Sequence, residues 1–406
     1  MTNIIKGVIS EIWSSKQILS PIIHLCDQIG PRPSGSDAAG QAADFIQTEF
    51  EIGNLTTSTH EFTHNSWSPE EFSFAIENQT FPAIPFNLSG NGQLSGDCYY
   101  IANPSKKAFE HARFDGKILL AESSHGMGMH RTEILKKAVE GGAIAYIQVA
   151  KTPGGIVEKG IISTKGIAEI PAVCISYEAG HFLRRKSQQA GVTVTIKVKG
   201  KVGLAIGKNV IGNINTGSDE TIILGAHYDT WENSPGAFDN GTGIATLLKL
   251  AEVYSQLEQL NVNLQFIAFS AEELGFKGST AYKEEAVESR EVSVPLMVNF
   301  DCTAYPRGQR TISVSNSNAI YDTLGHLLES FNFDSTINNR PPFGTDGFPF
   351  YLSKIPVVSL EQIDKTKPSY MHTAFDTPEK LTEDSLKNST AIAGAVLGEI
   401  IRQKYT

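Results

Sequence analysis

One segment near the middle of the chain carries side chains of the kind that hold metal ions. Residues 225–243 read GAHYDTWENSPGAFDNGTG and contain His227, Asp229 and Asp239, with His227 directly after the apolar run TIILGA. Imidazole mixed with carboxylate, without thiolate, suits zinc or a similar borderline metal better than magnesium or calcium. An isolated histidine–x–aspartate is typical of a surface turn, so a metal site here depends on partners elsewhere in the chain.

Such partners follow other apolar runs. Glu272 and Glu273 come after LQFIAFSA, Asp301 ends LMVNFD, Asp346 lies in FGTDGFPF, and His372 lies in SYMHTAFDTPEKL. Carboxylates crowded together repel one another and need compensation to stay ionised. Two histidines with three or four acids suit a pair of metal ions roughly 3.5–4 Å apart that share one carboxylate. We therefore expect two zinc ions.

The elements that must position these residues alternate along the chain after residue 203. Apolar strands separated by amphipathic helices predict an α/β fold with a mostly parallel central sheet and helices on both faces. Ligands of such sheets bind beyond the carboxyl ends of the strands, where these acids and histidines lie. The expected strands are 220–226, 262–270, 293–301, 310–315 and 355–360, and the expected helices are 241–258, 278–289, 316–331 and 383–402.

The block 76–202 has a different character, with short β-runs separated by Gly, Asn and Pro. It contains DGKILLAE, KKAVEGGAIAYIQV and IPAVCISYEAGHFL in that order, and it resembles the protease-associated domain. A generic small α/β domain is the competing interpretation. The resemblance implies a non-catalytic lid inserted into a discontinuous catalytic domain, which then comprises 1–75 and 203–406.

The motifs of the rest of the chain resemble those of the di-zinc exopeptidases. HYD, FDN, AEELG, NFD and MHTAFDTPEKL occur in the order found in that family, which includes bacterial leucine-type aminopeptidases, glutamate carboxypeptidase and the inactive transferrin receptor. The resemblance implies that one zinc is held by His227, Asp239 and Asp301, and the other by Asp239, Glu273 and His372. It also implies that Glu272 is the general base, that Asp229 fixes His227, and that the Asp239–Asn240 peptide bond is cis.

Two positions near the last histidine have more than one possible role. The family often has a tyrosine close before this histidine that stabilises the oxyanion; here Met371 is adjacent, so Tyr370, one position further back, is the candidate. Asp376 either orients His372 or caps the helix that follows.

The predicted function is an aminopeptidase that hydrolyses the N-terminal residue of peptides. A water bridging two zinc ions attacks the scissile carbonyl, with Glu272 as its general base. The acidic edge of the site favours a cationic terminus, although one well-placed arginine would favour a carboxypeptidase of the same family. Two further functions stay open: a glutaminyl cyclase, which uses one zinc, and a non-catalytic receptor-like relative, against which the intact Glu272 counts.

The composition limits the partners and the location. The 406 residues carry a net charge of −10, which argues against nucleic-acid binding. No apolar run approaches 18 residues, so no membrane span is expected, and the N-terminal residues lack the core of a signal peptide. We predict a cytoplasmic enzyme with peptides as its partners, while the oligomeric state stays open. Four scattered cysteines make a disulfide framework unexpected: Cys26, Cys98, Cys174 and Cys302.

Overall fold

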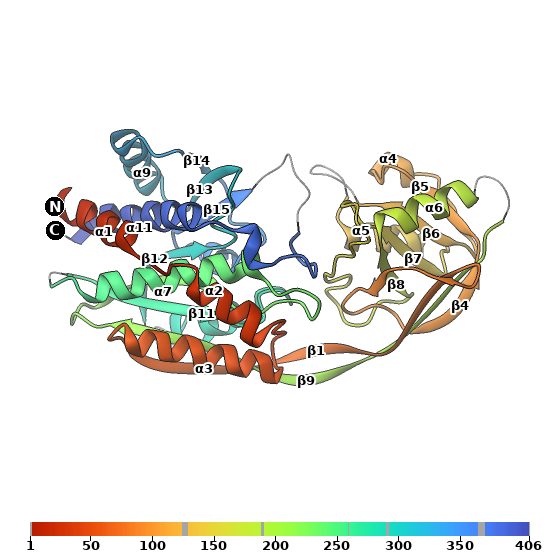
Figure 1. Ribbon diagram of the computed structural model, residues 1–406, viewed down its shortest axis with the longest axis horizontal. Coiled ribbons are helices and arrows are strands. Elements are labelled where there is room, and N and C mark those ends of the chain that lie inside the picture. Colours follow the sequence, from red (N-terminus) through yellow and green to blue (C-terminus); the bar gives the residue numbers. More distant parts are fainter. Residues whose placement is uncertain are drawn as a thin grey trace. The chain divides into compact units, whose positions relative to one another are not determined.

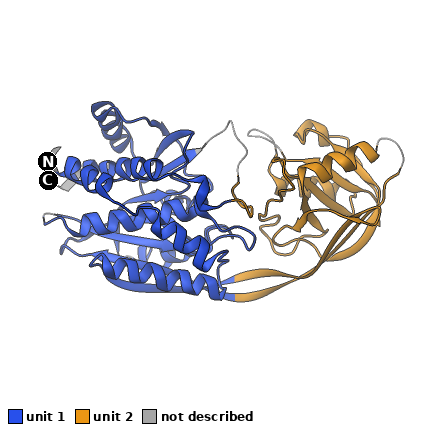
Figure 2. Cartoon of the chain, viewed as in Figure 1, with its two compact units in different colours: residues 1–64, 205–367, 376–406 blue, residues 65–204, 368–375 orange. Residues whose placement is uncertain are grey.

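The computed structural model describes residues 2–123, 129–187, 191–258, 260–289, 292–363 and 370–405. The chain forms two compact units (Figure 2). Unit 1 comprises 1–64, 205–367 and 376–406, and unit 2 comprises 65–204 and 368–375.

Unit 1 begins with helices and continues as alternating strands and helices after the second unit (Figure 1). Two strands of 21 residues each, β1 (Thr56–Ile76) and β9 (Val194–Ile214), contribute residues to both units. The other strands of unit 1 are β10 (Glu220–His227), β11 (Asn263–Phe269), β12 (Ser293–Phe300), β13 (Gln309–Ser315), β14 (Thr336–Asn339) and β15 (Val357–Ile363). Its α-helices are α1 (Thr2–Ser14), α2 (Ser20–Ile23), α3 (Asp37–Ile52), α7 (Thr242–Ser255), α8 (Lys277–Tyr282), α9 (Asn318–Phe331), α10 (Gly347–Leu352) and α11 (Glu383–Tyr405). Shorter helical turns are η1 (His24–Ile29), η2 (Ala237–Gly241), η3 (Lys283–Val287) and η4 (Pro378–Lys380).

The central sheet has the strand order β14-β13-β15-β12-β10-β11-β9-β1-β2. Its four middle strands are parallel, because β10 pairs in parallel with β11 and β12, and β12 with β15. The flanking strands β13 and β9 run antiparallel to β15 and β11. Residues 301–308 join β12 to β13 without a helix, and a parallel pairing needs a longer crossover. The predicted α/β fold is therefore confirmed, with a sheet of mixed orientation.

Helices cover both faces of this sheet. Ile223 of β10 and Met297 of β12 pack with Tyr282 of α8 and Phe350 of α10. Leu224, the neighbour of Ile223, points to the opposite face because side chains alternate along a strand, and it is equally buried. Since α7 contacts β10, β11 and β12, it covers that second face. The carboxyl ends of the parallel strands are thus held between two layers of helix.

Unit 2 has its own five-stranded sheet with the order β3-β8-β7-β6-β5. Its strands β5 to β8 are parallel, and β3 is antiparallel to β8. The predicted insert 76–202 lies inside this unit, and its role as a protease-associated lid stays a prediction. The remaining elements are β2 (Gln79–Thr80), β3 (Ala83–Pro85), β4 (Gly92–Gly96), β5 (Cys98–Ile101), α4 (Lys106–Phe109), β6 (Ile118–Glu122), α5 (Arg131–Glu140), β7 (Ala145–Val149), β8 (Ala172–Ile175) and α6 (Tyr177–Ser187).

Across the described residues of both units, no helix is both long enough and apolar enough to traverse a lipid bilayer.

Candidate metal centre

His227 is the last residue of the buried strand β10 and lies opposite Phe269, the last residue of β11. Its Nδ1 is 3.1 Å from the main-chain oxygen of Asp229. A carbonyl oxygen only accepts hydrogen bonds, so the neutral imidazole donates from Nδ1 and carries its lone pair on Nε2. This is the tautomer that a metal ligand requires, with the second ring nitrogen held by a fixed acceptor.

Two carboxylates converge on that Nε2. Asp239 Oδ1 is 3.3 Å from it and Asp301 Oδ1 is 3.8 Å from it. The donor atoms of all three residues lie within 4.8 Å of one another. Oxygen and nitrogen ligands about 2.0–2.1 Å from a tetrahedral zinc ion are separated by about 3.3 Å. The three residues therefore fit a zinc ion without a large rearrangement.

The electrostatics of this cluster also favour a cation. His227, Asp239, Glu272 and Asp301 are all buried. Burial alone lowers the pKa of His227, but the surrounding carboxylates, Glu272 first among them, raise that pKa well above its usual value. Burial raises the pKa of Glu272, and the negative charge of Asp301 raises it further. Buried carboxylates that share one imidazole need additional positive charge to stay ionised, which a divalent metal ion supplies.

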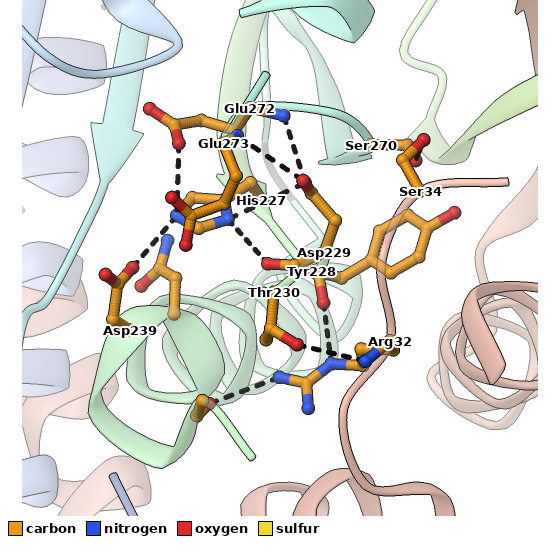
Figure 3. Close-up of polar contacts among 12 residues, drawn as sticks. Arg32, Ser34, His227, Tyr228, Asp229, Thr230, Asp239, Ser270, Glu272 and Glu273 are labelled. Atoms are coloured by element: carbon orange, nitrogen blue, oxygen red, sulfur yellow. Dashed lines mark hydrogen bonds and ion pairs between the residues drawn. The ribbon is translucent and has the colours of Figure 1, made fainter. Parts of the chain in front are cut away.

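The carboxylate of Asp229 holds the main chain of both predicted glutamates (Figure 3). Its Oδ1 accepts the N–H of Glu272 at 3.0 Å and its Oδ2 accepts the N–H of Glu273 at 3.3 Å. The same Oδ1 is 3.7 Å from Nδ1 of His227, too far for a hydrogen bond. The bond that the resemblance assigned to the Asp229 side chain is thus made by its main-chain carbonyl, because the carboxylate is already engaged by two amides.

Glu272 and Glu273 are adjacent in sequence but offer their carboxylates to different neighbours. Glu272 Oε2 is 3.9 Å from Nε2 of His227. A carboxylate oxygen of Glu273 lies within 4.8 Å of one of Asp239. Ala271, just before them, has a left-handed backbone with φ of +59°, a conformation uncommon outside glycine that is found at functional sites. The loop after β11 therefore presents two carboxylates, one beside His227 and one beside Asp239.

Asp239 lies in η2, and its peptide bond to Asn240 is cis, which confirms that prediction. The fully buried side chain of Asn240 connects this turn to the residues on either side of Asp301. Its Nδ2 donates to the Phe300 carbonyl at 2.8 Å, and its Oδ1 accepts the Cys302 N–H at 3.0 Å. Asn240 thus ties the two carboxylate-bearing segments together. Sequence reasoning missed this role, although the FDN motif contained the residue.

The carboxylate of Asp376 fastens the other side of the turn. It accepts the N–H of Phe238 at 2.8 Å and that of Asp239 at 3.0 Å. The sequence suggested that Asp376 either orients His372 or caps a helix. The cap prediction is wrong, because Thr377 precedes η4 and no side chain caps that turn.

His372 and Tyr370 lie in the short segment that belongs to unit 2. The main-chain oxygen of His372 accepts the N–H of Lys159 at 3.0 Å, and its φ is +61°. The carbonyl of Tyr370 accepts the N–H of Thr373 at 3.2 Å. Their assignments as metal ligand and oxyanion donor stay predictions.

Asp346 and Arg340 come from the loop before α10. Asp346 is buried, and within the described part of the chain neither of its carboxylate oxygens has a hydrogen-bond partner. Burial raises its pKa to about 7. Arg340 forms an ion pair with Glu361 and donates from Nε to Ser313 at 3.2 Å.

Part of the sequence is similar to a known protein family. Residues 209–397, which include every predicted metal ligand, match peptidase family M28. This segment, a little under half of the chain, is similar to members of that family. The resemblance drawn from the HYD, FDN, AEELG, NFD and MHTAFDTPEKL motifs is confirmed at the level of similarity to this family of peptidases.

Two curated relatives illustrate the similarity. Aminopeptidase YwaD of Bacillus subtilis is 24% identical over 405 residues, covering 97% of this chain and 86% of the relative. A probable lipoprotein aminopeptidase of Mycobacterium tuberculosis, LpqL, is 31% identical over 170 residues, which are 42% of this chain and 33% of that protein.

Solved structures share the fold. A zinc aminopeptidase from Bacillus subtilis superposes with a TM-score of 0.78 at 23% identity, covering 96% of each chain. The peptidase M28 precursor from Shewanella amazonensis superposes with a TM-score of 0.85 at 19% identity, covering 100% of this chain and 97% of that one.

Proposed function

We propose that this protein is a zinc aminopeptidase that removes the N-terminal residue from peptides. The observation that carries the proposal is the convergence of Asp239 and Asp301 on Nε2 of His227, with the carboxylate of Glu272 3.9 Å from the same nitrogen. A ligand set and a candidate base thus share one buried site. The names of the relatives, which are aminopeptidases, support the same substrate class.

The proposal includes two zinc ions. His227, Asp239 and Asp301 would hold the first, and Asp239, Glu273 and His372 would hold the second, with Asp239 contributing to both. Bound zinc polarises the scissile carbonyl and lowers the pKa of a coordinated water to about 7. The mixture of imidazole and carboxylate donors supports zinc over magnesium or calcium.

The protein's own residues then carry the proton. Glu272 accepts a proton from the attacking water and delivers it to the leaving amine. Asp229 keeps Glu272 in place through the N–H bond of 3.0 Å. The hydroxyl of Tyr370 donates a hydrogen bond to the oxygen of the scissile carbonyl as negative charge develops there.

The charges around the site support an amino-terminal rather than a carboxy-terminal specificity. Glu272, Asp301 and Asp346 are buried carboxylates that attract the ammonium group of a free N-terminus. A carboxypeptidase needs a cation for the substrate carboxylate, and Arg340 is instead neutralised by its ion pair with Glu361.

A substrate panel tests the proposal. We expect hydrolysis of aminoacyl-anilides and of C-terminally amidated peptides, no hydrolysis of N-acetylated peptides, and loss of activity with a chelator that added zinc reverses. Cleavage of N-acetylated peptides from their C-terminus would establish a carboxypeptidase. Release of ammonia from N-terminal glutamine without peptide-bond cleavage, with one zinc per chain, would establish a glutaminyl cyclase. Zinc binding without any turnover would fit a receptor-like relative.

Two further parts of the proposal concern the insert and the location. Residues 76–202 act as a protease-associated lid that favours short peptides, so replacing them by a short linker should speed the hydrolysis of long peptides relative to tripeptides. The enzyme acts in the cytoplasm, which fractionation of cells producing the tagged protein would test.

A further inference from the structure

Arg32 lies in the segment between η1 and α3, and its side chain is completely buried. Within the part of the chain that the structure describes, its guanidinium donates hydrogen bonds to main-chain carbonyl oxygens, and the thiol of Cys26 is a further neighbour. Nε bonds Tyr228 at 2.6 Å, and Nη1 bonds Pro235 at 2.6 Å and Gly30 at 3.2 Å. Nη2 bonds Gly236 at 3.2 Å. Figure 3 shows the side chain of Arg32 reaching the loop beside Tyr228 and Thr230.

This is an unusual place for a positive charge. Among the described residues, no carboxylate lies within ion-pairing distance of the Arg32 guanidinium. Removing a guanidinium from water is costly, and a paired carboxylate is the usual compensation. Here the compensation comes from several carbonyl dipoles and from the more distant charges of Asp376 and Asp229.

The hydrogen bonds of Arg32 hold both ends of one loop. Residues 228–236 connect His227 at the end of β10 with η2, which carries Asp239. Nε holds the loop one residue after His227, and Nη1 and Nη2 hold it just before η2. Between these points, the main-chain N–H of Arg32 donates to Oγ1 of Thr230 at 3.0 Å. The planar guanidinium presents donors in a rigid fork, so one side chain sets the separation of the two loop ends.

The loop has little room to adjust if these bonds are lost. Gly236 has a left-handed backbone with φ of +66°. A Cβ atom there would lie 2.3 Å from Cγ2 of Thr230 and 2.6 Å from the main-chain oxygen of Asp239. The turn before Asp239 is therefore closely packed onto the middle of the loop that Arg32 holds.

We propose that Arg32 is a positioning residue for the first metal site, which fixes His227 and Asp239 relative to each other by holding both ends of the loop 228–236. The proposal rests on the proposed function only in taking these residues as zinc ligands. Arg32 touches neither the donor atoms nor the substrate in this mechanism, and its action runs through the main chain.

Zinc titration of the metal-free protein by calorimetry tests the proposal with Arg32→Met and Arg32→Lys. We expect both variants to weaken the first site by about 10–100-fold, the range typical when the support of a metal ligand is removed. The zinc affinity of the second site should fall by less than that of the first site. Lysine keeps the charge but offers one ammonium group on a flexible stem instead of a fork, so it should not rescue binding. Asp301→Asn and Glu273→Gln identify which binding step belongs to which site.

Arg185→Met is the matched control, because the side chain of Arg185 is exposed on α6, and this variant should titrate like the wild type. Near-ultraviolet circular dichroism checks that each variant is folded. If Arg32→Met does not fold, Thr230→Val, which removes the acceptor of the Arg32 N–H, should still weaken the first site selectively. Wild-type affinity in Arg32→Lys would overturn the proposal, as would equal weakening of both sites. If the wild-type protein binds zinc but hydrolyses no peptide, the proposed function is refuted while this inference stands.

Discussion

Asp376 follows Asp239 by 137 positions in the sequence, yet its Oδ2 accepts the main-chain N–H of Asp239 at 3.0 Å. The contact is reinforced by Oδ1, which accepts the N–H of Phe238, and by the carbonyl of Asp376, which accepts the N–H of Ala237 at 3.1 Å. The turn that presents Asp239 to His227 is therefore held by the chain segment that follows residue 375.

Replacing Asp376 by asparagine should weaken the metal site. Asparagine keeps the size of the side chain, but it replaces one carboxylate oxygen by an NH₂ group. That group would face the main-chain N–H of Phe238 or of Asp239, and the buried N–H would then lack an acceptor. We expect zinc affinity and kcat to fall by about 10–100-fold, measured by zinc titration and initial rates. Asp384→Asn, in the exposed first turn of α11, is the control and should behave like the wild type. Unchanged zinc affinity in Asp376→Asn would contradict the role of this contact.

Asp229→Asn should disturb both glutamates at once. Its two carboxylate oxygens accept the amides of Glu272 and Glu273, and asparagine can accept only one of them with its single oxygen. We therefore expect a lower kcat together with weaker binding of one zinc ion. Rates and metal content measured on the same preparation check this, with Asp219→Asn, at a position outside the site, as the control. A variant that loses rate while it keeps both metals at full affinity would show that Glu273 does not depend on this bond.

Mutation should distinguish the roles of the two adjacent glutamates, Glu272 and Glu273. Glu273→Gln should weaken one zinc and lower activity in a way that excess zinc partly restores. Glu272→Gln keeps the shape but removes the proton acceptor, so both zinc ions should stay while turnover falls by about 10²–10⁴-fold, without rescue by zinc. Elemental analysis beside the rates decides between the two roles. Loss of zinc in Glu272→Gln with retention in Glu273→Gln would reverse the assignment.

The metal-free protein should lose stability as the pH rises from about 5 to 8. Burial raises the pKa of Asp346 and of Asp376 to about 7, far above the value of about 4 in an unfolded chain. The pKa of His227 is also raised, by Glu272, Asp239 and Asp301 against the effect of burial. The folded protein thus binds more protons than the unfolded chain in this range, and its free energy of unfolding falls as the pH rises.

Thermal unfolding in a chelator at pH 5 and pH 8 measures this effect. Carboxylates with lowered pKa values, such as Glu70 and Glu71 beside lysines, titrate below this window and do not mask it. Asp346→Asn should flatten the dependence, and zinc should remove it by stabilising the ionised cluster. A melting temperature of the metal-free protein that increases towards pH 8 would count against a buried uncompensated acid cluster.

The sequence by itself was sufficient for the α/β fold and for the gathering of His227, Asp239 and Asp301. Apolar strands separated by amphipathic helices imply a parallel core, and the ends of parallel strands meet at one edge. The antiparallel direction of β13 was not predicted, because it depends on the short connection 301–308 rather than on the pattern of apolar residues.

Only the tertiary structure decided what holds the ligands in place. The partners of Asp229, Asn240 and Asp376 are main-chain amides and carbonyls of other loops, and every residue has such groups, so no residue type or spacing marks them. Arg32 reaches Gly236 from 204 positions away. Hydrophobic periodicity determines which elements pack together, but the path of each loop between them determines which polar groups meet.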